Sequence, residues 1–160
     1  MKRLAIAVSM LAIGAAGCGS STPSSPSTTT IFTVQLSALN EVPPITNAEA
    51  TARGTAVITI DSVKNTVDFN VSLNSFPAGS AVNIAHIHGP APVGNNASVV
   101  ISTTLTPGNV TLTNGSGTFS FLQVTAPAAT IAAILANPSN FYFNVHTTLN
   151  GGGAIRGWLQ

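Results

Sequence analysis

Charged side chains are scarce in this chain. Asp, Glu, Lys and Arg make up 6% of its 160 residues, whereas roughly 25% is typical of soluble domains. After Lys2 and Arg3, only three basic and four acidic side chains remain, and the basic ones lie far apart in the sequence. Because a nucleic-acid-binding surface needs clustered Lys and Arg, the composition argues against nucleic acid as a partner.

Residues that support common enzyme mechanisms are also few. Cys18 is the only cysteine, so no disulfide can form within the chain. No serine lies in a Gly-x-Ser-x-Gly turn, the four acidic residues show no pairing, and no glycine-rich loop carries a lysine. These absences argue against a serine hydrolase, a glycosidase and a nucleotide-binding enzyme. We therefore assign no catalytic residue; any activity is expected to be copper-dependent redox chemistry.

The first residues have the pattern of a targeting signal. Lys2 and Arg3 precede an apolar stretch, residues 4–16, which is too short to span a bilayer. The sequence Ala15-Ala16-Gly17-Cys18 that follows resembles the cleavage box of bacterial lipoproteins. The resemblance implies a signal peptide over residues 1–17, a lipid on Cys18, and a place in the bacterial cell envelope, anchored to a membrane. The alternative is an ordinary secretory signal with an incidental cysteine.

Residues 19–30 contain only Gly, Ser, Thr and Pro. Such a composition cannot bury a core and is typical of a flexible tether. The predicted organisation is therefore a signal peptide, then Cys18 and its tether to residue 30, and a single domain over residues 31–160.

Alternation of apolar and polar residues recurs throughout this domain. The clearest case is Val67, Phe69, Val71 and Leu73, which alternate with polar residues and so predict a strand with one buried face. The other predicted strands cover residues 32–36, 55–60, 82–88, 98–105, 117–124, 141–148 and 154–160. About eight short strands predict an all-β fold, an antiparallel β-sandwich or flattened Greek-key barrel.

One segment departs from this period. Ile131, Ile134 and Leu135 have helical spacing within residues 126–137, and Pro138 follows directly. The pattern predicts a short crossover helix that covers one end of the sandwich.

Four motifs follow one another in a distinctive order. They are residues 32–39 with Asn40-Glu41-Val42-Pro43-Pro44, then Ala85-His86-Ile87-His88-Gly89-Pro90-Ala91, then Asn144-Val145-His146-Thr147, and finally Gly153-Ala154-Ile155-Arg156-Gly157-Trp158-Leu159. Together they resemble the CHRD domain, which is repeated in animal chordin and found alone in many bacterial exported proteins. The resemblance covers residues 31–160 and implies an exported β-domain. Ala154 stands where the family usually has Glu, and growth-factor binding by chordin is not carried over, because function belongs to sites rather than to folds.

The chain has three histidines, and all of them lie in these motifs. His86 and His88 are two residues apart on a predicted strand, so both side chains point to the same face. With His146 from another strand, three imidazoles can bind copper or, as a weaker candidate, zinc. The pattern also resembles copper-zinc superoxide dismutases, which implies that these histidines are copper ligands and that Arg156 guides anions. The chain lacks a fourth, zinc-bridging histidine and the disulfide of those enzymes.

The direction of side chains places this candidate site outside the core. If Phe143 faces the core, Asn144 and His146 face outward, beneath the loop at residues 40–47 or the one at 89–96. Glu41 would then lie near the histidines, either as an oxygen ligand or, with Asn144 and Arg156, in the surrounding shell.

The same geometry predicts that Val82 and Ile84 face outward, which needs a bulge or a covering loop. The alternative to a metal site is a structural cluster, in which the histidines hold loops and a Glu41–Arg156 pair ties the first loop to the last strand.

These observations favour a non-enzymatic binding module with a protein or polysaccharide partner. The first alternative is a copper-binding or zinc-binding protein that uses the three histidines. The second alternative is an adhesion module that presents an edge strand.

Overall fold

Alternating sequence patterns become eight β-strands in the computed structural model, which describes residues 28–160. Residues 1–17, Cys18 and the tether up to residue 27 lie outside the described residues. The strands are β1 Thr29–Ser37, β2 Arg53–Asp61, β3 Thr66–Asn74, β4 Val82–His88, β5 Val99–Ser102, β6 Gly117–Thr125, β7 Tyr142–Thr147 and β8 Ile155–Trp158. The α-helix is α1 Ala128–Ala136, and 3-10 helices cover Ala38–Asn40 and Pro138–Asn140. Within residues 28–160, no helix has the length and hydropathy needed to cross a membrane.

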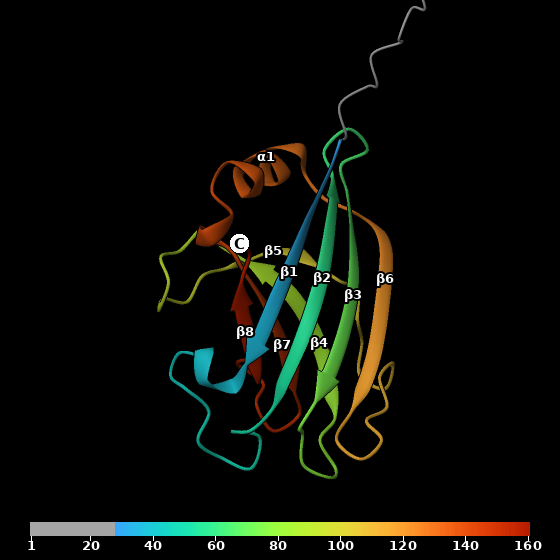
Figure 1. Cartoon of the computed structure of the whole chain (residues 1–160), viewed down its shortest axis with the longest axis vertical. Helices are drawn as coiled ribbons and strands as arrows, with labels where there is room; N and C mark the ends of the chain where they lie inside the picture. Colours follow the sequence, from blue (N-terminus) through green and yellow to red (C-terminus); the bar gives the residue numbers. More distant parts are fainter. Residues whose placement is uncertain (1–27) are drawn as a thin grey trace, which may run out of the picture.

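All eight strands belong to one sheet, in the order β5-β4-β7-β8-β1-β2-β3-β6, with antiparallel neighbours. The sheet curls into a half-barrel (Figure 1). Phe69 on β3 therefore stacks on Phe143 on β7, with ring centroids 5.6 Å apart, although β8, β1 and β2 lie between their strands in the sheet. The prediction of an all-β fold with one short helix is confirmed. The two layers of the predicted sandwich are the two halves of one continuous curled sheet.

The core fills the inside of this curl. The four predicted apolar residues of β3 are at most 3% exposed, and they pair in register with β2, where Ile58 is opposite Phe69 and Ile60 is opposite Val67. Residues between them point outward and remain half-buried or exposed. The alternation in sequence thus decides which face of each strand is removed from water.

The helix α1 covers one end of the half-barrel and connects the edge strand β6 to β7 in the other half (Figure 1). Ile131 and Ile134 are its buried residues. It begins after Pro127, whose missing N–H cannot continue the hydrogen bonds of the sheet, and it ends before Asn137 and Pro138. The predicted helix is confirmed and is shorter at both ends.

Two local predictions differ from the structure. The bulge that this segment was expected to need is present between Val82 and Ile84, where the β4–β7 register shifts. It returns Val82 to the core, so Val82 does not face outward as the simple alternation predicts. Strand β5 ends at Ser102, earlier than predicted. Both the backbone N–H and the hydroxyl of Thr103 donate to the carbonyl of Ala85, at 3.1 and 2.9 Å, and Thr104 has a positive φ of 65°, so the chain leaves the sheet there.

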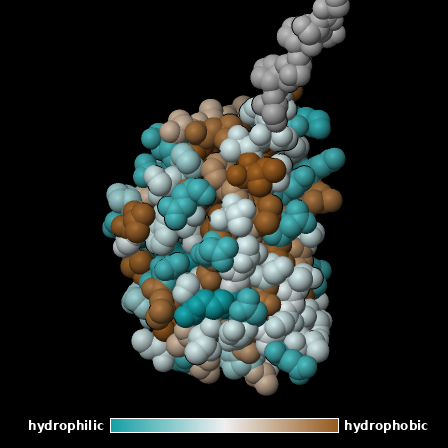
Figure 2. Space-filling model, viewed as in Figure 1, coloured by the Kyte–Doolittle hydropathy of each residue, from teal (hydrophilic) through white to brown (hydrophobic). Residues whose placement is uncertain are grey.

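The outer surface mixes polar and apolar residues. Figure 2 shows hydrophobic residues scattered among hydrophilic ones on the face in view. Scattered single apolar residues are normal on protein surfaces, so this face does not by itself indicate a docking surface.

Candidate metal centre

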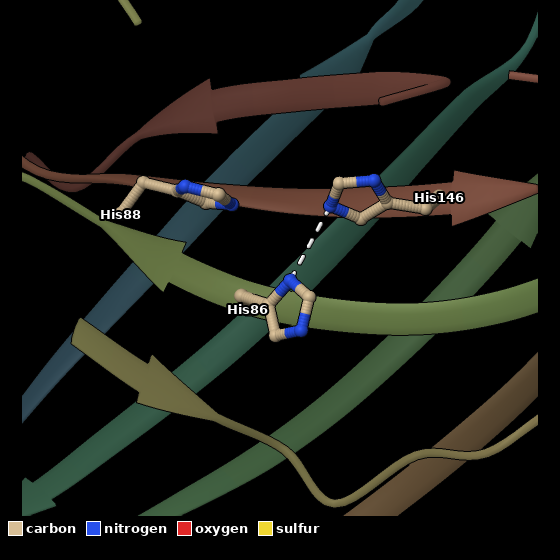
Figure 3. A group of neighbouring side chains, drawn as sticks. All are labelled: His86, His88 and His146. Atoms are coloured by element: carbon tan, nitrogen blue, oxygen red, sulfur yellow. Dashed lines mark hydrogen bonds between the residues drawn. The ribbon is translucent and has the colours of Figure 1, made fainter. Parts of the chain in front are cut away.

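The three histidines lie together on the outer face of two neighbouring strands. His86 and His88 come from β4 and His146 from β7 (Figure 3). Each ring places one nitrogen within 4.8 Å of the ligand nitrogens of the other two. The closest pair is Nδ1 of His86 and Nε2 of His146, 3.3 Å apart. The structure therefore brings all three predicted ligands into one cluster, on the face that the alternation predicts.

Backbone carbonyls determine which nitrogen of two of these rings is free. Nδ1 of His88 lies 3.0 Å from the carbonyl oxygen of Ala97, and Nδ1 of His146 lies 3.0 Å from that of Gly151. Because a carbonyl oxygen only accepts, both Nδ1 atoms carry the proton, and both Nε2 atoms carry a lone pair. Metal-binding histidines are oriented by this kind of hydrogen bond.

The two Nε2 lone pairs have different surroundings. Nε2 of His88 is buried and has no hydrogen-bond partner among residues 28–160. Nε2 of His146 accepts from Nδ1–H of His86 across the 3.3 Å contact, because only His86 is left to supply the proton. A bound metal ion would take the place of this proton.

Burial keeps the three rings neutral. Burial, together with the smaller effects of the nearby His146 and His88, lowers the pKa of His86 to about 4. Burial also lowers the pKa of His88 and of His146, against the opposing effect of their hydrogen bonds to backbone carbonyls, and the charge of Arg156 adds to the lowering in both. Neutral imidazole is the form that binds metal ions, so no proton has to be displaced from a charged ring at neutral pH.

Tyr142 supports His88 from the neighbouring strand. The two rings are parallel within 2° and their centroids are 4.9 Å apart. The tyrosine hydroxyl accepts a hydrogen bond of 3.1 Å from the N–H of Ala97, and the carbonyl of the same residue holds His88. Tyr142 and Ala97 thus fix the plane and the tautomer of one ligand.

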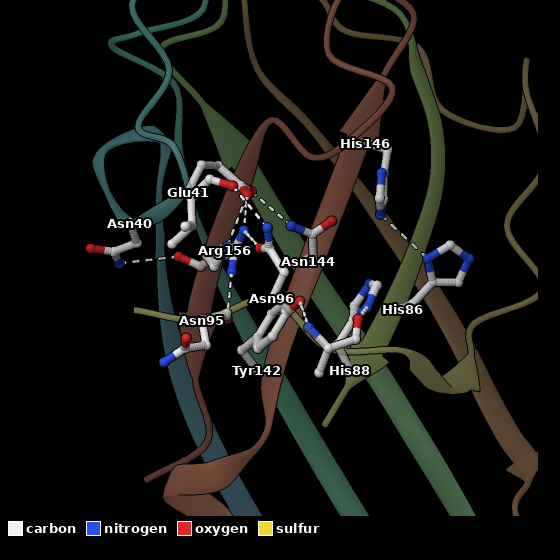
Figure 4. A network of polar contacts seen from close by, with 12 residues as sticks. Asn40, Glu41, His86, His88, Asn95, Asn96, Tyr142, Asn144, His146 and Arg156 are labelled. Atoms are coloured by element: carbon white, nitrogen blue, oxygen red, sulfur yellow. Dashed lines mark hydrogen bonds and ion pairs between the residues drawn. The ribbon is translucent and has the colours of Figure 1, made fainter. Parts of the chain in front are cut away.

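A buried ionic network lies beside the histidines (Figure 4). Nη2 and Nε of Arg156 both lie 2.8 Å from Oε2 of Glu41. Nδ2 of Asn144 donates to Oε1 of Glu41 at 2.7 Å. Burial raises the pKa of Glu41, and Arg156 and Asn144 oppose that rise. Asn144 and Arg156 therefore hold the carboxylate of Glu41 in place. The Glu41–Arg156 ion pair that was expected to tie the first loop to the last strand is present.

Arg156 is placed differently from an anion guide. It is 2% exposed, and besides Glu41 its guanidinium donates to the carbonyl of Asn95 at 3.3 Å and to Oδ1 of Asn96 at 2.7 Å. It also lies 4.4 Å from the centroid of the Tyr142 ring. The guanidinium thus holds the loop that follows β4.

A second polar cluster supports the loop whose Gly151 carbonyl orients His146. Glu49 is fully buried and accepts hydrogen bonds from Ser80 at 2.6 Å, Thr147 at 2.7 Å and Asn150 at 2.6 Å. Asn150 directly precedes Gly151, whose carbonyl orients His146. The sequence does not reveal this cluster, because its members come from three separate segments and form no recognisable motif.

Comparison with known families agrees with the motifs and the geometry. Residues 32–159 match the model of the CHRD domain. No curated protein and no solved structure matches the chain. The match covers nearly all of the curled sheet, including the three histidines, Glu41, Asn144 and Arg156, and on this basis the chain belongs to the CHRD domain family.

Proposed function

We propose that this CHRD domain binds one copper ion through His86, His88 and His146. The observation that carries the proposal is the buried, unpartnered Nε2 of His88 within 4.8 Å of ligand nitrogens from the two other rings. A buried lone pair without a donor favours a cation beside it. Two of the three rings are already oriented by backbone carbonyls, so little ordering is needed on binding.

Copper is favoured over zinc because Cu(II) has the higher affinity for nitrogen donors. Three neutral imidazole nitrogens suit both metals. For a given site of this kind, Cu(II) binds more tightly than Zn(II) in the general order of divalent affinities. The role is metal binding, and any redox reaction at the copper would use these same residues.

Metal titration tests the proposal directly. Chelator-treated chain is titrated with Cu(I), Cu(II) and Zn(II), with calorimetry and the fluorescence of Trp158, the only tryptophan, as readouts. Trp158 lies 5.7 Å from Tyr142, which stacks on His88, so bound Cu(II) is expected to quench it. We expect one ion per chain, and a loss of affinity of roughly 100-fold or more in His88→Ala and in His146→Ala.

The matched control is Asn70→Ala. Asn70 is an outward-facing residue of β3 that accepts a hydrogen bond from Ser120 on β6, and both strands lie in the half of the sheet away from the histidines. This variant should bind copper like the parent chain. Absence of saturable binding, or equal affinity in His146→Ala and the parent chain, would contradict the proposal.

We also propose that the chain is exported and anchored to a membrane of the cell envelope through a lipid on Cys18. The support is the charged start, the apolar residues 4–16 and the small residues before the cysteine. Cys18→Ala is expected to move the protein from the membrane fraction to the soluble fraction of cells, whereas Ser20→Ala should leave it membrane-bound. Retention of Cys18→Ala in the membrane fraction would count against the anchor.

A protein or polysaccharide partner is a third proposal, supported by the edges of the sheet. Strands β5 and β6 end the strand order, and residues of both line a pocket of about 560 Å³. Edge strands are a common docking site for extended partners. A partner that still binds His88→Ala would separate this role from metal binding.

A further inference from the structure

Asn144 lies on the face of β7 that carries the histidine cluster. In the β4–β7 ladder it is directly opposite His86, so their side chains project from adjacent positions on the same face. On β7 it stands two residues before His146 and therefore shares its face. It is 1% exposed, so what it contacts is decided by the protein around it and not by solvent.

The orientation of the Asn144 amide is fixed by its partner. Nδ2 donates to Oε1 of Glu41 at 2.7 Å, and a carboxylate ion-paired with an arginine only accepts. The amide oxygen must therefore point away from Glu41, and Figure 4 shows it directed toward His146.

Close packing holds this orientation in place. A Cβ at Gly153 would lie 2.5 Å from Nδ2 of Asn144 and 2.7 Å from Oε2 of Glu41. Gly153 also has a positive φ of 136°, so glycine alone allows the β7–β8 turn to approach the Asn144–Glu41 hydrogen bond this closely. The amide is thus enclosed as well as hydrogen-bonded.

The amide oxygen itself is left without a partner. Oδ1 of Asn144 is buried and accepts no hydrogen bond from any of the residues 28–160. Nε2 of His88 is the second buried acceptor in the same state. A buried acceptor without a donor is unfavourable. Two such acceptors on the face that also carries His86 and His146 can be satisfied together by one cation.

We propose that Oδ1 of Asn144 is the fourth ligand of the metal, which makes the centre a three-nitrogen, one-oxygen site; this inference rests on the proposed metal binding. Glu41 is a positioning residue, because it directs the amide oxygen toward the metal and is itself held by Arg156. An oxygen ligand suits Cu(II) and Zn(II) and contributes little to the soft ion Cu(I). Asn144 therefore determines selectivity for the divalent ions.

Asn144→Ala tests the inference in the full chain. We expect affinity for Cu(II) and Zn(II) to fall about tenfold or more, affinity for Cu(I) to stay within about twofold, and the Cu(II) electron paramagnetic resonance spectrum to change. The control Asn70→Ala should change none of these. Equal Cu(II) affinity and an unchanged spectrum in Asn144→Ala would overturn the inference while leaving metal binding by the histidines intact. If the unmodified chain binds no metal ion, the proposed function itself is overturned.

A measurement on the unmodified chain guards against misfolding of the variant, since Asn144→Ala removes a hydrogen bond from buried Glu41. Zn(II) is diamagnetic, so the side-chain carbonyl carbon of Asn144 can be followed by nuclear magnetic resonance in metal-free and Zn(II)-loaded protein. Coordination through Oδ1 should shift this resonance more than that of any other asparagine. Shifts confined to the imidazole resonances would show that Asn144 is not a ligand.

Discussion

Replacing Arg156 with methionine is expected to lower the free energy of unfolding by about 3–5 kcal/mol. The substitution leaves the carboxylate of Glu41, which is 3% exposed, buried without its counter-charge. It also removes the donors to Asn95 and Asn96, which hold the loop after β4. Chemical denaturation of the metal-free chain, monitored by circular dichroism, measures the change.

Two further variants distinguish a buried charge from general loss of packing. Glu41→Gln combined with Arg156→Met removes both charges, so it should recover part of the stability lost in the single variant. Lys64→Met removes the exposed partner, 71% accessible, of the Lys64–Asp61 pair and should change stability far less than Arg156→Met. A loss below about 1 kcal/mol in Arg156→Met would mean that the ion pair does not hold this face of the sheet together.

Phe143→Ala is the second substitution with a large expected effect, a loss of about 3–5 kcal/mol. Phe143 is fully buried and its ring stacks on that of Phe69 across the inside of the curl. Removing the ring leaves a cavity between the two halves of the half-barrel, because the curled backbone cannot collapse to fill it. Thermal and chemical denaturation of the same samples provide the measurement.

A smaller change at the same position serves as the matched control. Phe143→Leu keeps most of the volume and should cost clearly less than Phe143→Ala. Leu122→Ala, at a side chain that is 64% exposed on the edge strand β6, should change stability by less than about 0.5 kcal/mol. Similar values for Phe143→Ala and Leu122→Ala would contradict the packing of Phe143 between the two halves of the sheet.

The fold was predictable because its signal is local. The alternation in β3 is visible within eight residues, and the helical spacing of Ile131 and Ile134 is visible within four. Each pattern depends on the direction of successive side chains, which the backbone geometry of a strand or helix determines. The error at Val82 has the opposite cause, because the bulge that returns it to the core arises from pairing with β7, a segment about sixty residues away.

The candidate site was predictable only in part. The common face of His86 and His88 follows from their spacing, and a Glu41–Arg156 pair was one of two hypotheses for those residues. The carbonyls of Ala97 and Gly151, which set the tautomers of His88 and His146, belong to loop backbone and have no signature in the residue type. Likewise, the amide oxygen of Asn144 lacks a hydrogen-bond partner because Glu41 accepts from the amide nitrogen, and no sequence pattern reveals that contact.

The sequence by itself determined that this protein is an all-β domain of the CHRD family with three histidines on strands and one covering helix, because periodicity and motifs are properties of neighbouring residues. Only the tertiary structure decided that the three rings meet on the outer face and that Nε2, not Nδ1, carries the lone pair in His88 and His146. It also decided that Arg156 is buried, where it binds Glu41 and a loop. These outcomes depend on contacts between β4, β7, β8 and three loops, and such contacts form only when the sheet curls and brings distant segments together.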